Sequence, residues 1–141
     1  MTNHQVTILL VDDDEVDTMA VKRAFRRLKI ANPVVKCRNG IDALEHLRGQ
    51  NGHEKLPSPY LILLDLNMPR MSGIEFLREL RRDSELHSIP VVVLTTSDAE
   101  KDKIEAYDLN VAGFLVKPVT FPSFAELMAT LNKYWTLVDM L

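Results

Sequence analysis

Several residues that could do chemistry stand directly behind apolar runs of the sequence. They are Asp12, Asp13, Asp65, Thr95 and Lys117. Three carboxylates that meet repel one another and favour a divalent cation, and a ligand set made only of oxygens suits Mg²⁺. A cation, an ammonium group and a hydroxyl around one carboxylate form a site for phosphoryl transfer, because they stabilise charge on the transferring group.

Each of these polar residues follows a run that is short and aliphatic enough to be a strand. Continuous apolar runs bounded by prolines, glycines or charges indicate strands that are buried on both faces. The predicted strands cover residues 6–11, 34–37, 60–64, 91–94 and 113–116.

Segments with the apolar spacing of amphipathic helices separate the runs. The predicted helices cover residues 16–28, 41–47, 74–82, 99–109 and 121–135. The helix over 99–109 is strongly polar, so we expect it to bury little and to be weakly held. Alternation of strand and helix, five times over, predicts an α/β fold with a parallel sheet and helices on both faces. The carboxyl ends of parallel strands share one edge, so the five polar residues should converge there.

Composition narrows the function classes. The chain of 141 residues has about the length of one domain, and its net charge of −3 argues against a general affinity for nucleic acid. Cys37 is the only cysteine, which excludes an intrachain disulfide, and we expect it to pack in a strand. No apolar run approaches the roughly 18 residues that cross a bilayer, and residues 1–5 do not resemble a signal peptide, so we expect a cytoplasmic protein without membrane contact.

Histidines and the acidic residues behind the first strand have simpler interpretations. The four histidines show no ligand spacing and are expected on the solvated surface: His4, His46, His53 and His87. Asp14 and Asp17 are open to two interpretations, as extra metal ligands or as helix caps, and capping is favoured.

Taken together, the motifs resemble the receiver domain of a two-component response regulator. The resemblance covers essentially the whole chain and rests on the acidic pair after Leu9–Val11, the run Leu64–Pro69 with Gly73, Thr95 after 91–94, and Lys117-Pro118. It implies a single receiver domain over residues 1–141. It also implies a flavodoxin-like, doubly wound, five-stranded parallel sheet with strand order 2-1-3-4-5.

The same resemblance assigns roles around the phosphoryl group. Asp65 would accept it from a phosphohistidine on a sensor kinase. Mg²⁺ would be held by Asp13, Asp65 and the main-chain carbonyl of Asn67, with Asp12 reaching the ion through water.

The remaining implied roles concern the switch. Thr95 and Lys117 would contact the phosphoryl oxygens. Phe114 stands where the family most often has a tyrosine; it can swing between buried and exposed positions but has no hydroxyl to bond.

A finer similarity concerns the partner. The long loop over 49–59, the Thr95-Thr96-Ser97 run and the aromatic tail are similar to small regulators that pair with phytochrome-type histidine kinases, which often form homodimers. The apolar tail over 133–141 would expose a large patch on a monomer, so we expect a homodimer through the last helix and the tail. The alternative is that the tail folds back over its own domain.

The pattern favours a stand-alone phosphoacceptor switch and not an enzyme. Such a switch assists its own phosphorylation and acts through phosphorylation-dependent protein contacts. One alternative is a haloacid-dehalogenase-type phosphatase with Asp12 as nucleophile, since Asp12-x-Asp14-x-Val16 resembles that family's first motif. The chain is short for that fold with a cap, and no acidic pair follows Lys117. A degenerate receiver that only docks is the other alternative, and the intact acidic, threonine and lysine residues argue against it.

Overall fold

The computed structural model describes residues 6–54, 59–96 and 99–137, and these form alternating strands and helices. The strands within these ranges are β1 (Thr7–Val11), β2 (Val34–Cys37), β3 (Tyr60–Leu64), β4 (Val91–Thr95) and β5 (Gly113–Val116). The helices are α1 (Glu15–Arg27), α2 (Gly40–Arg48), α3 (Gly73–Arg82), α4 (Glu100–Asp108) and α5 (Phe121–Leu137). All the predicted elements are present, with ends that differ by at most two residues.

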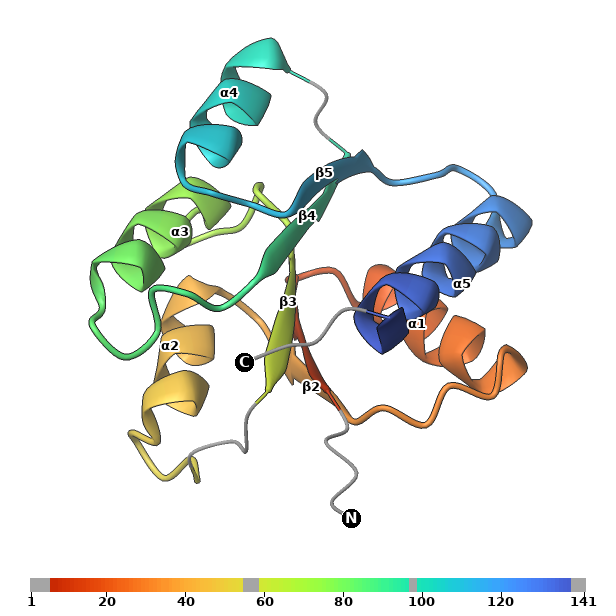
Figure 1. Cartoon of the computed structure of the whole chain (residues 1–141), viewed down its shortest axis with the longest axis horizontal. Coiled ribbons are helices and arrows are strands. Elements are labelled where there is room, and N and C mark those ends of the chain that lie inside the picture. The colour runs from red at the N-terminus through yellow and green to blue at the C-terminus, as the bar shows by residue number, and fades with distance from the viewer. Residues whose placement is uncertain (1–5, 55–58, 97–98, 138–141) are drawn as a thin grey trace.

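The strands form one parallel sheet in the order β2-β1-β3-β4-β5. The chain builds outward from β1 to β2 and then crosses to the other side of β1, so the order reverses between β1 and β3 (Figure 1). Val11 at the end of β1 pairs with Leu64 at the end of β3, and Leu64 pairs with Val93. Ligands of doubly wound sheets bind at such a reversal, outside the carboxyl ends of the strands.

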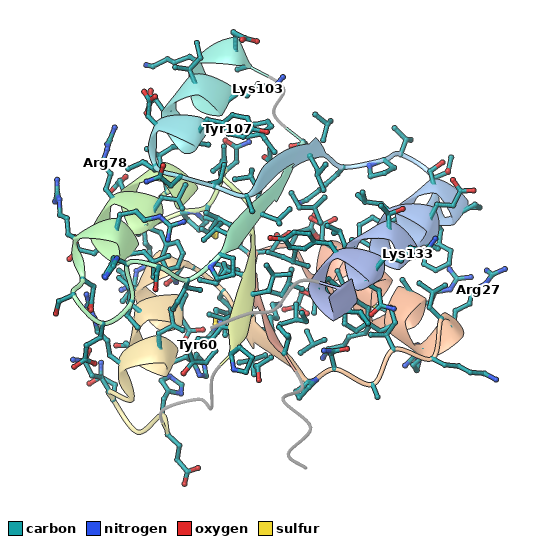
Figure 2. The ribbon with its side chains drawn as sticks, in the orientation of Figure 1. Arg27, Tyr60, Arg78, Lys103, Tyr107 and Lys133 are labelled. Atoms are coloured by element: carbon teal, nitrogen blue, oxygen red, sulfur yellow. The ribbon has the colours of Figure 1, made fainter. Side chains whose placement is uncertain are left out.

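Helices cover both faces of the sheet, with α1 and α5 on one side and α2, α3 and α4 on the other (Figure 1). Each layer closes over its own apolar core, and Figure 2 shows side chains filling both spaces. Alternate residues of β1 illustrate the division: Leu9 packs with the α2–α4 layer and Ile8 with the α1–α5 layer. This doubly wound arrangement confirms the predicted fold class.

Two helices differ in how firmly they are held. Ala106 is the only buried residue of α4, as its polar sequence predicts, and Tyr107, labelled beside this helix in Figure 2, is exposed. Helix α5 runs on to Leu137, and Trp135 is only 3% exposed, with its ring centroid 5.9 Å from that of Phe25. The expectation that Trp135 belongs to an exposed contact surface is therefore wrong, because it packs in its own domain. The rest of the tail, 138–141, lies outside the described residues.

Across the described residues, we find no helix with both the length and the apolar character needed to cross a membrane.

Candidate functional site

Three carboxylates meet at the carboxyl edge of the sheet, as predicted. Asp12 and Asp13 follow β1 and Asp65 follows β3, and the pairing of these strands brings carboxylate oxygens of all three within 4.8 Å of one another. Asp12 is 2% exposed and Asp65 is 7% exposed, whereas Asp13 is open to solvent. The site therefore has buried negative charge with one open side.

Lys117, which follows β5, reaches into this acidic cluster. Its Nζ donates to Oδ2 of Asp12 at 3.0 Å, also contacts the carboxylate of Asp17, and lies 3.8 Å from Oδ2 of Asp65. The side chain is only 8% exposed. Buried charges of opposite sign stabilise one another, because a buried charge without a partner has no interaction that compensates its desolvation free energy.

These contacts shift two pKa values. Burial raises the pKa of Asp12 to about 7, although the N–H of Asp14, which donates to its Oδ1 at 2.9 Å, and the Lys117 ammonium both favour the charged carboxylate. Burial works to lower the pKa of Lys117, but its contacts with Asp17 and Asp12 outweigh that and raise it. Lys117 therefore stays positively charged despite its burial, because the carboxylates of Asp12 and Asp17 lie next to it.

The remaining predicted residues surround Asp65. Thr95 ends β4 fully buried, and its carbonyl accepts the N–H of Lys117 at 2.8 Å. The N–H of Asn67 points at Oδ1 of Asp65 across 3.4 Å. Phe114 is half-buried on β5 and packs on the side of the sheet that carries α2, α3 and α4. The structure brings Asp12, Asp13, Asp65 and Lys117 into direct proximity and places Thr95 at the same sheet edge.

The loop that carries Asp65 is held by the start of α3. The N–H of Gly73 donates to the carbonyl of Leu66 at 3.0 Å, and the hydroxyl of Ser72 caps the helix by accepting the N–H of Glu75 at 3.2 Å. A Cβ added to Gly73 would lie 2.6 Å from the carbonyl oxygen of Asp65. Only glycine lets the helix approach the Asp65 loop this closely.

Asp14 and Asp17 separate in role. Asp14 caps α1, with its Oδ1 accepting the N–H of Val16 at 2.8 Å, as favoured by the sequence. Asp17 does not cap the helix; it holds Lys117 from the first turn of α1. Sequence reasoning missed this contact, and the only available signal was that Asp17 opens the helix that begins directly behind the acidic pair.

A groove of about 580 Å³ lies beside the acidic cluster, between α1 and the segment that joins β5 to α5. Its wall includes the exposed apolar side chains of Val16, Met19 and Val119. Basic side chains of α1 also line it, and the guanidinium of Arg23 lies 3.9 Å from the ring centroid of Phe121. Exposed apolar groups beside positive charge form a surface that suits a protein partner.

Comparison with known protein families assigns this arrangement. The model of the response regulator receiver domain matches residues 8–131. The chain belongs to the response regulator receiver family. This confirms the resemblance seen in the sequence and gives no support to the phosphatase alternative with Asp12 as nucleophile.

Individual relatives have similar length and structure. Response regulator Rcp1 of Synechocystis is 36% identical over 134 residues, covering 95% of this chain and 91% of that protein. A crystal structure of Mn²⁺-bound Rcp1 aligns with a TM-score of 0.87 at 35% identity, covering 96% of this chain and 99% of that one. The phosphorylated cyanobacterial phytochrome response regulator RcpA aligns with a TM-score of 0.89 at 32% identity, covering 96% and 98%.

A further relative comes from another biological setting. The probable methanogenesis regulatory protein FilR2 of Methanothrix harundinacea is 38% identical over 128 residues, covering 91% of this chain and 82% of that protein. The family and its phytochrome-associated members are thus both represented among the similar proteins, as the sequence resemblance predicts.

Proposed function

We propose that Asp65 is the phosphoacceptor of this receiver domain. Its carboxylate oxygen would attack the phosphorus of a phosphohistidine, so that an oxygen–phosphorus bond forms as the nitrogen–phosphorus bond breaks and the imidazole leaves. The observation that carries the proposal is that Asp65 lies between the Asp12–Asp13 pair and Lys117 at the sheet edge. Asp12, the other buried carboxylate of the cluster, is already bonded to Lys117 at 3.0 Å, whereas Asp65 lies 3.8 Å from that ammonium.

The acidic cluster fits a hard divalent cation, because its donors are carboxylate oxygens and one side is open. We propose Mg²⁺, held by Asp13 and Asp65 with the main-chain carbonyl of Asn67, and with Asp12 acting through water. The similar Rcp1 structure is a Mn²⁺-bound form, which supports a divalent ion as a ligand of this kind of domain. When bound, Mg²⁺ would supply positive charge for the oxygens of the transferring group.

Lys117 and Thr95 are the proposed contacts of the phosphoryl group. Lys117 is held by Asp12 and Asp17 and lies 3.8 Å from Asp65, so a small shift of its ammonium would bring it to an oxygen bound at Asp65. Thr95 would donate its hydroxyl to another oxygen. Its main-chain link to Lys117 couples the two residues, because movement of one strand end moves the other.

The switch that follows is proposed to run through α4 and Phe114. Helix α4 buries only Ala106, so a change of a few kcal/mol or less can reposition it. As Thr95 moves toward the phosphoryl group, Phe114 would swing inward. The protein is on this view a phosphoacceptor switch, not an enzyme, although it assists its own Mg²⁺-dependent phosphorylation and dephosphorylation.

The proposed phosphoryl donor is a sensor histidine kinase of the phytochrome type or a phosphotransfer protein. The transfer is proposed to take place in the cytoplasm. Similarity to the phytochrome response regulator RcpA supports the first of these donors. The groove lined by Val16, Met19 and Val119 is the proposed docking surface, because it adjoins the sheet edge that carries Asp65. The basic side chains at its rim would favour a partner helix with apolar and acidic side chains. With a net charge of −3, direct binding to nucleic acid is not part of this proposal.

We retain the homodimer through α5 and the tail as a proposal, and with it a single working unit of residues 1–141. Because Trp135 belongs to the core, a cut after Lys133 would unfold the chain and is not a fair test. Removing residues 138–141 keeps Trp135 and every described core residue, and should yield a monomer in light scattering at tens of micromolar. A full-length chain that is already monomeric under these conditions, phosphorylated or not, would exclude the dimer.

The phosphoacceptor proposal is tested by acetyl phosphate labelling with Mg²⁺, followed by intact-mass measurement and peptide mapping. Asp65→Asn should abolish the added phosphoryl mass, and the exposed Asp108→Asn should label like the wild type. Labelling that survives in Asp65→Asn, or that maps to a peptide containing Asp12, would refute the assignment. A second arm uses an autophosphorylated phytochrome-type kinase as donor and asks whether Val119→Glu slows transfer while acetyl phosphate labelling is unchanged.

A further inference from the structure

A second group of side chains of the types that bind metals lies on α2 and in the loop that follows it. Asp42, Glu45 and His46 are spaced i, i+3 and i+4 on α2, and so share one face of the helix. His53 returns to this face from the loop, and its ring centroid lies 3.7 Å from that of His46. His46 and His53 are partly exposed, but the expectation that the histidines show no ligand spacing is wrong for these two, because the fold brings them together.

The distances suit one cation held against Asp42. Its Oδ1 lies 3.5 Å from Nε2 of His53 and 3.7 Å from Nε2 of His46. Ligands of a tetrahedral zinc ion bind at about 2.0–2.1 Å, which puts neighbouring ligand atoms roughly 3.3–3.4 Å apart. Ligand atoms of Asp42, Glu45 and His53 also fall within 4.8 Å of one another. His46 lies within the same distance of Asp42 in a separate group, so a rotation of side chains is needed to bring all four ligands around one ion.

Surrounding contacts orient these side chains. The other carboxylate oxygen of Asp42 accepts the N–H of Arg38 at 3.1 Å, which leaves Oδ1 to face the two imidazoles. The amide of Asn51 contacts Glu45 from the loop. Outer contacts of this kind fix the ligands of protein metal sites and so reduce the entropy lost on binding.

The loop is shaped to bring His53 back. Gly49 ends α2 in the left-handed conformation, with φ 67°, and Gly52 also has a positive φ of 86°. The N–H of His53 donates to the carbonyl of Gln50 at 3.1 Å, which closes the turn. The side chains of Asp42, His46 and His53 are 22%, 18% and 31% exposed, so they are sheltered but remain open to an ion from solvent.

The chemistry of the donors decides the class of ion. Two imidazole nitrogens and two carboxylate oxygens form a mixed set that suits Zn²⁺ and related transition metals, whereas Mg²⁺ prefers oxygen alone. Cys37 also approaches Asp42 and His46, but it is completely buried at the end of β2, whereas Glu45 and His53 are partly exposed and can meet an ion from solvent.

We propose that Asp42, Glu45, His46 and His53 form a binding site for Zn²⁺ that ties the beginning of the loop after α2 to the helix. The site shares no residue with the acidic cluster at Asp65, and the proposal does not depend on the function assigned to Asp65. Binding one ion would require an unprotonated nitrogen of each imidazole to face it.

Zn²⁺ titration of the full chain, freed of any purification tag and stripped with EDTA, tests this. Because the acidic cluster can also take Zn²⁺, the titration is done in an Asp13→Ala background, with Zn²⁺ alone as the probe. We expect one ion per chain there, a roughly tenfold to hundredfold loss of affinity in His53→Ala, and no change in His87→Ala, which removes an exposed histidine elsewhere. Urea unfolding followed by the fluorescence of Trp135 checks that each variant is folded.

A second measurement identifies the ligands. Long-range ¹H–¹⁵N spectra of the histidine side chains should show the signals of His46 and His53 shifting with one equivalent of Zn²⁺ while that of His87 stays fixed. Equal Zn²⁺ affinity in His53→Ala, or unmoved signals of His46 and His53, would overturn the proposal. Co²⁺ substitution that gave a thiolate-to-metal charge-transfer band would also overturn it, because Cys37 would then replace the proposed ligands.

Discussion

Gly73→Ala should destabilise the protein and impair the Asp65 site together. Glycine is a poor helix residue, so alanine at the first position of α3 should by itself stabilise the fold by about 0.5–1 kcal/mol. The tertiary contact acts in the opposite direction. The new Cβ would lie 2.6 Å from both the carbonyl oxygen of Asp65 and the Cα of Leu66, which are backbone atoms.

The size of the effect follows from what has to move. Backbone cannot rotate away as a flexible side chain can, so α3 or the Asp65 loop must shift by several tenths of an ångström. Overpacking of this kind typically costs about 1–3 kcal/mol. After subtracting the gain in helix propensity, we expect the free energy of unfolding to fall by up to about 2.5 kcal/mol. The displaced Asp65 should also accept a phosphoryl group several-fold more slowly, because its carboxylate leaves the position set by the acidic pair and Lys117.

Urea unfolding measures the first effect, with Trp135 as reporter, since it is the only tryptophan and is buried. The rate of labelling by acetyl phosphate measures the second. Gly113→Ala is the matched control: its Cβ would meet only Cγ1 of Val92 at 4.0 Å, so stability should be unchanged or slightly higher. If Gly73→Ala is as stable as the wild type and labels at the same rate, the close approach of α3 does not position Asp65.

The other predictions concern charge at the same site. The pKa of Asp12 is about 7 in the fold and 3.8 ordinarily, so the folded state binds more protons between these values and, without metal, the free energy of unfolding falls as pH rises through this window. Asp12→Asn should remove this pH dependence. In urea titrations from pH 5 to 8, the free energy of unfolding of the wild type should fall by at least about 1 kcal/mol relative to that of the variant. Parallel pH profiles would contradict this. Asp17→Asn frees Lys117 from one partner and removes a negative charge near the site that acetyl phosphate, an anion, must approach. Labelling by acetyl phosphate should therefore be roughly twofold to fivefold faster. Slower labelling would contradict this. Asp13→Ala should lose Mg²⁺ binding and labelling together, and labelling that persists in EDTA would rule out the proposed metal.

The sequence by itself determined the fold and the location of the acidic site. Strands such as β3 are read from a local signal, a short apolar run ending at a charged residue. Once the alternation with helices makes the sheet parallel, the carboxyl ends must share an edge. Asp12, Asp13, Asp65, Thr95 and Lys117 could be brought together on paper for this reason. The capping role of Asp14 is equally local, since it depends on the N–H groups of the next turn.

Only the tertiary structure decided the contacts between distant segments, because no local sequence pattern specifies how such segments are oriented relative to one another. Asp17 meets Lys117 because the first turn of α1 and the residue that follows β5 lie at the same edge of the sheet, and Trp135 is buried because α5 runs far enough to reach Phe25. His53 stacks on His46 because positive φ angles in the intervening loop turn the chain back. Apolar periodicity shows that a face is buried but not against which neighbour, and the path of a loop depends on backbone angles that composition leaves open.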